Sequence, residues 1–185
     1  TVDAMSKIIK NTMAKCDQEH IPVITVSIPD IPDRTESILN HNDKPFKKMS
    51  EYLKILENAD EGCIIIPCNT AHFWFDQLQE RTHTKMISIV ESAVKHIEKT
   101  DTREVCILAT SATISTQLYQ NKFSENNMKF STPSSEIQQK IMDSIYKYKS
   151  GNYEESKEII NQVINLYGLN SDRKFLLACT ELPLI

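Results

Sequence analysis

Short apolar runs alternate along this chain with longer segments whose apolar residues recur at helical spacing, and this alternation limits the folds that the chain can adopt. The apolar runs predict strands at 22–29, 62–67, 85–90, 103–110 and 173–178. The segments between them predict helices at 2–17, 36–58 with a break near HNDKP, 70–80, 91–99, 111–123, 136–151 and 152–168. Gly151 and Gly168 are expected to close the last two helices. Alternating strands and helices favour parallel sheets covered on both faces, so we predict an α/β fold.

Two cysteines follow apolar runs in the same way. Residues 64–72 read IIIPCNTAH and end an expected strand on Cys68, and residues 175–183 read FLLACTELP and end another on Cys179. Thr110 and the segment 27–34 also fall at the carboxyl ends of expected strands. Ligands of such sheets bind beyond these ends, so we expect the polar groups to meet on one rim.

The residues after each cysteine suggest why a thiol is placed there. Cys68 precedes Asn69 and Thr70, which are typical helix-capping residues, and Cys179 precedes Thr180 and Glu181. A thiol at a helix N-terminus lies near unpaired N–H groups and the positive end of the helix dipole, which favour the thiolate. We therefore expect both sulfur atoms to be chemically active.

The remaining cysteines are interpreted as ordinary packing residues: Cys16, Cys63 and Cys106. A zinc site built from Cys63, Cys68 and His72 is disfavoured, because a strand, a turn and a helix would not bring these three side chains together. The odd number of widely spaced cysteines argues against a disulfide framework, so we expect reduced thiols in a cytoplasmic protein.

Composition narrows the possible partners. The net charge is −4 and no basic block is present, so nucleic-acid binding is not expected. No apolar run approaches the roughly 20 residues that cross a bilayer, and TVDAMSKIIK lacks the pattern of a signal peptide. A chain of 185 residues can form one domain or two small lobes.

Several short motifs resemble the aspartate/glutamate racemase superfamily, whose members need no pyridoxal phosphate. The two cysteine motifs are CNTAH at 68–72 and ACTELPLI at 178–185, and further matches are PDRT at 32–35, LATSAT at 108–113 followed by LYQ, and IYKYKSG at 145–151. The second motif contains CTE, whereas cell-wall glutamate racemases usually carry CTH. The chain is therefore more similar to the aspartate racemase branch, and the resemblance implies that no cofactor is used.

The resemblance implies two pseudo-symmetric lobes with the active site between them. The first lobe would comprise 1–92 completed by 181–185, and the second would comprise 93–180. One cysteine comes from each lobe, so Cys68 and Cys179 would exchange the roles of base and acid on opposite faces of the substrate carbon. The family also implies a homodimer.

The same resemblance assigns the residues that bind an acidic amino acid. Arg34 and Lys149 would bind its carboxylates, although a solvated loop charge and a helix-end charge are the simpler interpretations. The α-carboxylate would receive donors that are otherwise ordinary helix caps: Asn69, Thr70, Thr113 and Thr180. His72 and Glu181 would tune the protonation of the thiols. No metal ion is implied.

Other functions remain open at this level. The chain lacks the strand and glycine-rich loop that normally precede the segment resembled by TVD, so either it is part of a longer protein or its site lacks a wall. Ala112 and Ala178 stand where the family usually has glycine, which would narrow the pocket. Related enzymes include maleate isomerases, hydantoin racemases and arylmalonate decarboxylases, with maleate isomerase as the nearest alternative. A non-catalytic binding module is the third possibility.

Overall fold

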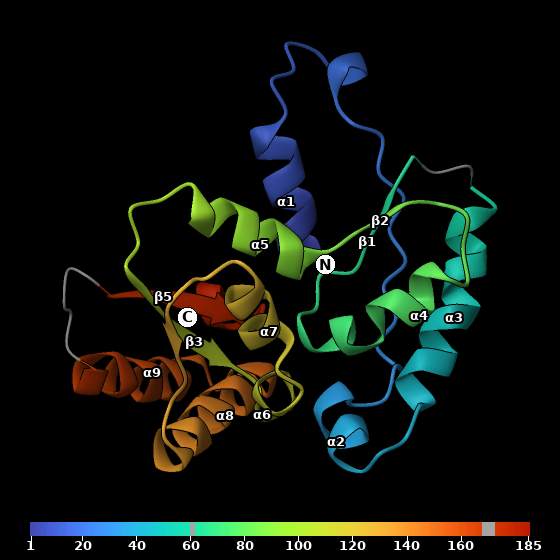
Figure 1. Ribbon diagram of the computed structural model, residues 1–185. Coiled ribbons are helices and arrows are strands. Elements are labelled where there is room, and N and C mark those ends of the chain that lie inside the picture. Colours follow the sequence, from blue (N-terminus) through green and yellow to red (C-terminus); the bar gives the residue numbers. More distant parts are fainter. Residues whose placement is uncertain (60–61, 168–172) are drawn as a thin grey trace.

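The computed structural model, which describes residues 1–59, 62–167 and 173–185, contains two separate parallel sheets (Figure 1). The first sheet pairs β1 (Ile64–Ile65) with β2 (Met86–Ile87). The second has the order β4-β3-β5, formed by Phe130–Ser131, Glu104–Ala109 and Arg173–Ala178. Helices flank both sheets, which confirms the predicted two-lobed α/β fold.

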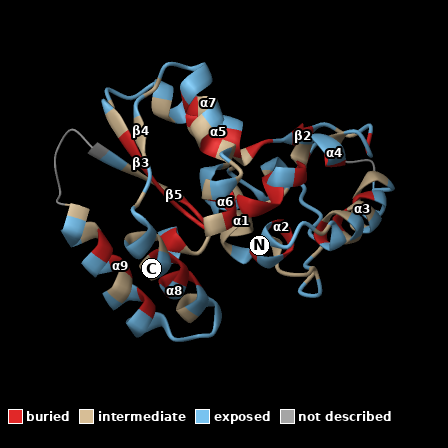
Figure 2. Ribbon diagram, turned by 60° about the horizontal axis from the view of Figure 1, so that its bottom comes forward, coloured by how far each residue is buried: buried red, intermediate tan, exposed pale blue. Residues whose placement is uncertain are grey.

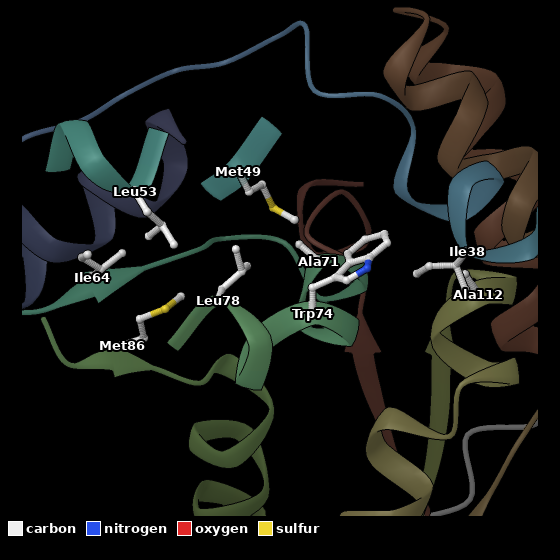
Figure 3. Close-up of a cluster of buried hydrophobic side chains, with 9 residues drawn as sticks. All are labelled: Ile38, Met49, Leu53, Ile64, Ala71, Trp74, Leu78, Met86 and Ala112. Atoms are coloured by element: carbon white, nitrogen blue, oxygen red, sulfur yellow. The ribbon is translucent and has the colours of Figure 1, made fainter. Parts of the chain in front are cut away.

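An apolar cluster that contains Trp74 is formed with four helices of the first lobe: α2 (Arg34–Leu39), α3 (Lys44–Glu57), η2 (Thr70–Trp74) and α4 (Phe75–Gln79). The helices α1 (Val2–Asn11) and η1 (Asp17–Glu19) contribute no residue to it. Met49 and Leu53 of α3, Leu78 of α4 and Ile64 of β1 pack into this cluster. Figure 3 shows that Ala112, which comes from the second lobe, lies beside Ile38 of α2 at its edge. The two lobes are therefore joined by an apolar contact as well as by the chain.

Strand β3 is buried on both faces, which explains its continuous apolar sequence. Val105, Ile107 and Ala109 face a cluster with α5 (Ile89–Glu98) and α7 (Leu118–Glu125), whereas Cys106 and Leu108 face α8 (Ser135–Lys149) and α9 (Tyr153–Tyr167). β3 is buried from Val105 to Ala109, with helices outside it, whereas β4 is only half-buried (Figure 2). The short helix α6 (Ser111–Ser115) follows β3 directly.

The strand predicted at 22–29 is wrong. This segment contains no helix and forms no ladder with any strand that the structure describes. The reason is physical: an extended backbone becomes a strand only when a neighbour pairs with its N–H and C=O groups. Val23 and Ile24 also remain 38% and 54% exposed, so burial does not hold the segment against a sheet.

Several helix boundaries differ from the prediction. The first helix ends at Asn11, because Thr12 is extended and its hydroxyl donates to the carbonyl of Ile8. The break near HNDKP is confirmed between α2 and α3, with a proline at the start of α3. The expected helix at 111–123 is split at Gln117, whose φ of 57° turns the chain between α6 and α7. Strand β4 was not predicted, and the predicted closure by Gly168 lies outside the described residues.

The predicted lobe boundaries at residues 92 and 181 stay predictions. Helix α5 runs across residue 92, and Leu182, in the terminal η3 (Leu182–Leu184), packs with Cys106 and Cys179 in the second lobe. Within the described residues, none of the helices has the length and apolar character needed to cross a bilayer.

Gly151 offers a test of the turn between α8 and α9. Its φ is +86°, yet a Cβ added there would meet no atom within 4 Å. We expect Gly151→Ala to lower the free energy of unfolding by about 1 kcal/mol through backbone strain alone. Gly62→Ala is the matched control, since that site is equally open and needs no left-handed conformation. Urea unfolding compares the two, and an equal effect would contradict the assignment of strain to Gly151.

Candidate active site

A cavity of about 240 Å³ lies at the carboxyl ends of β1, β3 and β5. Both lobes line it, and the sequence-predicted residues at its wall are Arg34, Cys68, Asn69, Thr70, Lys149, Cys179 and Thr180. The lining also includes Thr110 and Thr35 and two carboxylates, those of Asp33 and Glu181. The structure thus brings the two cysteine motifs to one cavity, as the positions of the strand ends require.

Cys68 is held at the rim by a tight turn. Its N–H donates to the carbonyl of Ile66 at 2.8 Å, so the chain reverses around Pro67 as soon as it leaves β1. The helix predicted at 70–80 follows, with its first five residues as the 3₁₀ helix η2 and the next five as α4. The thiol is half-buried. A single tight turn therefore sets its position.

His72 supports this turn through the backbone of Cys68 and does not contact its sulfur. The Nε2 atom accepts a hydrogen bond from the N–H of Ile89 at 3.0 Å, so the proton must reside on Nδ1, which lies 2.9 Å from the carbonyl oxygen of Cys68. Burial lowers the pKa of His72 and keeps the ring neutral. The ring therefore ties the Cys68 turn to the start of α5.

Cys179 lies beside a carboxylate. Its Sγ donates to Oε2 of Glu181 at 2.9 Å, and the hydroxyl of Thr180 donates to the same oxygen at 3.2 Å. The thiol is only 5% exposed. Burial, and then the charge of Glu181, raise the pKa of Cys179 well above its usual value. Burial and the neighbouring carboxylate thus oppose the thiolate that a helix N-terminus would favour at Cys179, and the hydrogen bond to Glu181 makes the thiol a proton donor.

Two cations face the cavity. The guanidinium of Arg34 donates to the carbonyls of Ile31 and Pro32 in its own loop, and it makes no ion pair with a carboxylate within the described residues. The ammonium of Lys149 lies 3.9 Å from Oε1 of Glu181, a loose pair whose side chains are 33% and 22% exposed. Both cations consequently keep donors available for an anionic ligand.

Three threonine hydroxyls form a buried triangle across the lobe junction. Thr70 lies 2.9 Å from Thr110 and 3.2 Å from Thr113, and the last two are 2.9 Å apart. Thr113 is completely buried and does not line the cavity. The structure therefore places Thr113 behind the predicted substrate donors, where it supports Thr70, and not at the cavity surface as predicted.

Tyr119 was missed by the sequence analysis. Its hydroxyl donates to Oδ1 of Asn69, although the two residues lie 50 positions apart and in different lobes. The tripeptide LYQ was noted there only as a match to a motif. A buried tyrosine needs a partner for its hydroxyl, and this need was the signal available in the sequence.

Metal binding finds no support in the part of the chain that the structure describes, where no group of three or more His, Cys, Asp or Glu side chains could hold an ion. Both ring nitrogens of His72 are occupied by hydrogen bonds, and Cys63 is exposed. The cavity instead presents two thiols, two cations, two carboxylates and several neutral donors. Arg34 has no carboxylate partner among the described residues and Lys149 is only loosely paired, so the set can still bind a small anion and transfer protons.

A model of the Asp/Glu/hydantoin racemase family matches residues 1–185. The chain belongs to this family. An aspartate racemase from Picrophilus torridus has a similar structure, with a TM-score of 0.88 and 30% sequence identity, and the match covers 100% of this chain and 77% of that one. An aspartate racemase homologue from Pyrococcus horikoshii OT3 shares the fold with a TM-score of 0.74, 24% identity and coverage of 99% and 81%.

A relative in sequence is the broad specificity amino-acid racemase RacX of Bacillus subtilis (strain 168), which is 28% identical over 110 residues. The match covers 60% of this chain and 46% of RacX, so the chain spans about half the length of that family member. These similarities agree with the branch that the CTE motif indicated.

The contact between Cys179 and Glu181 predicts a pH effect. Because Glu181→Gln removes a negative charge from the thiol, the pKa of Cys179 should fall towards its ordinary value while burial keeps it raised. The ultraviolet absorbance of the thiolate, read against Cys179→Ser, measures the shift. Glu155→Gln, which removes a surface carboxylate paired with Lys147, is the control.

The same change should alter stability at high pH. A thiol whose folded pKa is raised stabilises the fold fully below its unfolded pKa, and this contribution is lost as the pH rises towards the folded value. Glu181→Gln should therefore weaken the alkaline loss of stability. A pKa for Cys179 that is unchanged or higher in this variant would show that the carboxylate does not act on the thiol.

Proposed function

We propose that the protein is a cofactor-independent racemase that interconverts the L- and D-enantiomers of aspartate, glutamate or both. The observation that carries this proposal is that Cys68 and Cys179, from different lobes, line the same cavity of about 240 Å³. Inverting a stereocentre by proton transfer requires a base and an acid on opposite faces of the carbon, because a single base tends to return the proton to the face that it left.

The proton balance is complete with the two thiols. A thiolate at one cysteine removes the α-proton and becomes a thiol, and the opposite thiol gives its proton to the other face and becomes a thiolate. The hydrogen bond from Cys179 to Glu181 favours the form in which Cys179 begins as the acid. In the reverse direction the roles are exchanged, and Glu181 is then close enough to take part in deprotonating Cys179.

The carbanion needs stabilisation, since an amino-acid α-proton is weakly acidic. Hydrogen-bond donors aimed at the α-carboxylate stabilise the negative charge that develops on its oxygen atoms when the α-proton leaves. Asn69, Thr70 and Thr180 line the cavity and carry such groups. The cavity is also small compared with the usual range of ligand sites, about 300–1,000 Å³, which favours a single amino acid over a larger substrate.

An acidic side chain accounts for the two cations. Arg34 offers a planar fork that matches a carboxylate, and Lys149 offers a more mobile point charge on the other lobe. Binding of a second carboxylate at Lys149 would compete with its loose pair to Glu181. The name of the Picrophilus torridus neighbour, an aspartate racemase, supports the same substrate class, whereas the name of RacX supports an amino-acid racemase without indicating an acidic substrate.

Replacing either thiol tests the two-base mechanism. We expect Cys68→Ser and Cys179→Ser each to lower kcat by about 10²–10⁴-fold, because a serine hydroxyl is a far weaker acid and base. Chiral chromatography of aspartate and glutamate measures the loss. Cys63→Ser is the control, since Cys63 is exposed and lies close to Cys68 in sequence.

Full activity in either thiol variant would exclude a pair of essential cysteines. Turnover in D₂O provides a second check, because removal and return of the α-proton should place deuterium in the product. Incubation with maleate separates the isomerase alternative, which would yield fumarate.

Lys149 should determine the preference for acidic substrates. We expect Lys149→Met to raise KM for aspartate about 10-fold through loss of one charge-assisted hydrogen bond, with a smaller effect on alanine. Lys147→Met is the matched control, because Lys147 lies on the same helix and pairs with Glu155 on the surface. Steady-state kinetics with both substrates measure the change, and an equal rise for alanine would contradict a carboxylate contact.

A further inference from the structure

The ring of Tyr119 packs in the core of the second lobe, but its hydroxyl forms a hydrogen bond with a residue of the first lobe. The ring packs with Phe123, Val105 and Ile107, and the residue is 1% exposed. Its hydroxyl oxygen lies 2.5 Å from Oδ1 of Asn69. Gln117, with its left-handed backbone, begins α7 and so directs Tyr119 towards the lobe junction.

This contact fixes which end of the Asn69 amide faces the cavity. The atom that meets Tyr119 is the amide oxygen, Oδ1, which accepts the hydrogen bond from the hydroxyl. Burial raises the pKa of Tyr119, which keeps its hydroxyl protonated and able to donate. The amide nitrogen of Asn69 is left as the end that is free to turn towards the cavity.

The amide nitrogen has no hydrogen-bond acceptor among the described residues, and it is not among the buried unpaired atoms found there. Asn69 itself lines the cavity between Cys68 and Thr70. Its two N–H groups are therefore available to an anion in the cavity. The opposite orientation would present an oxygen that repels a carboxylate.

We propose that Tyr119 is a positioning residue, which holds the Asn69 amide with its NH₂ group towards the substrate carboxylate. The proposal rests on the proposed function for the identity of that carboxylate. Tyr119 touches no substrate and acts only through Asn69. Its hydroxyl also makes the orientation of a first-lobe donor depend on a second-lobe helix, so the donor is correctly aimed only when the lobes are docked.

A double-variant cycle separates this role from a general structural one. Tyr119→Phe keeps the ring and removes only the hydroxyl, and we expect it to lower kcat/KM for aspartate about 10-fold. In an Asn69→Ala background the same change should cost less than about 2-fold, because the amide that Tyr119 orients is gone. Tyr153→Phe, at a residue that is 58% exposed, is the control for removing a hydroxyl.

Two measurements do not depend on turnover. Calorimetry gives the dissociation constant of aspartate for the wild type, the two single variants and the double variant. Tyr119→Phe should weaken binding when Asn69 is present and should have little effect in the Asn69→Ala background. The side-chain NH₂ signals of Asn69 in nitrogen-15 NMR should shift in Tyr119→Phe. The variant should still unfold in a cooperative thermal transition, which shows that it is folded.

The outcomes distinguish the two proposals. Wild-type protein that binds aspartate but does not racemise it would defeat the proposed function, and the binding cycle and NMR signals would still decide the role of Tyr119. An equal loss from Tyr119→Phe with and without the Asn69 amide would overturn the positioning role. So would unchanged Asn69 signals together with unchanged binding in the single variant.

Discussion

The pairing of β3 with β5 is the constraint on which the site depends. The two strands run parallel in a fixed register from Glu104 opposite Arg173 to Ala109 opposite Ala178. Thr110 and Cys179 therefore leave the sheet side by side. A slip of one residue would turn every side chain of β5 to the other face and would move Cys179 away from the cluster in which it packs with Cys106 and Leu108.

The position of Cys179 relative to Cys68 has a different origin, because the two cysteines follow strands of separate sheets. Thr110 connects them: it follows β3, beside Cys179, and its hydroxyl bonds to that of Thr70, two residues after Cys68. Thr113 closes the hydroxyl triangle, and Tyr119 adds a parallel link to Asn69. A short chain of buried polar contacts thus relates one thiol to the other.

The two thiols have unequal surroundings despite their similar sequence contexts. Cys179 is buried against a carboxylate, whereas Cys68 is half-buried and the histidine of its motif hydrogen-bonds to backbone groups of Cys68 and Ile89. A carboxylate disfavours the neighbouring thiolate and can also accept its proton. In the proposed mechanism, Glu181 would hold Cys179 as an acid in one direction of reaction and help it to act as a base in the other.

The sequence was sufficient for features that depend on local patterns. The apolar runs ending in Cys68 and Cys179 located both strand ends, and Gly151 marked the end of α8. It was insufficient where distant residues decide the outcome. The segment 22–29 has a strand-like composition but no pairing partner within the described structure, and Tyr119 reaches Asn69 only because the lobes meet.

The hydroxyl triangle also explains how polar side chains can be buried at the lobe junction without destabilising the contact between the lobes. Each buried hydroxyl costs free energy if it is unpaired, and three hydroxyls that bond to one another leave none without a partner. Separating the lobes would break the bonds of Thr70 to both of its partners and the bond of Asn69 to Tyr119 at the same time. The apolar contact of Ile38 with Ala112 would be lost with them. Docking of the lobes, alignment of the thiols and orientation of the Asn69 amide are therefore coupled, because the same few contacts provide all three.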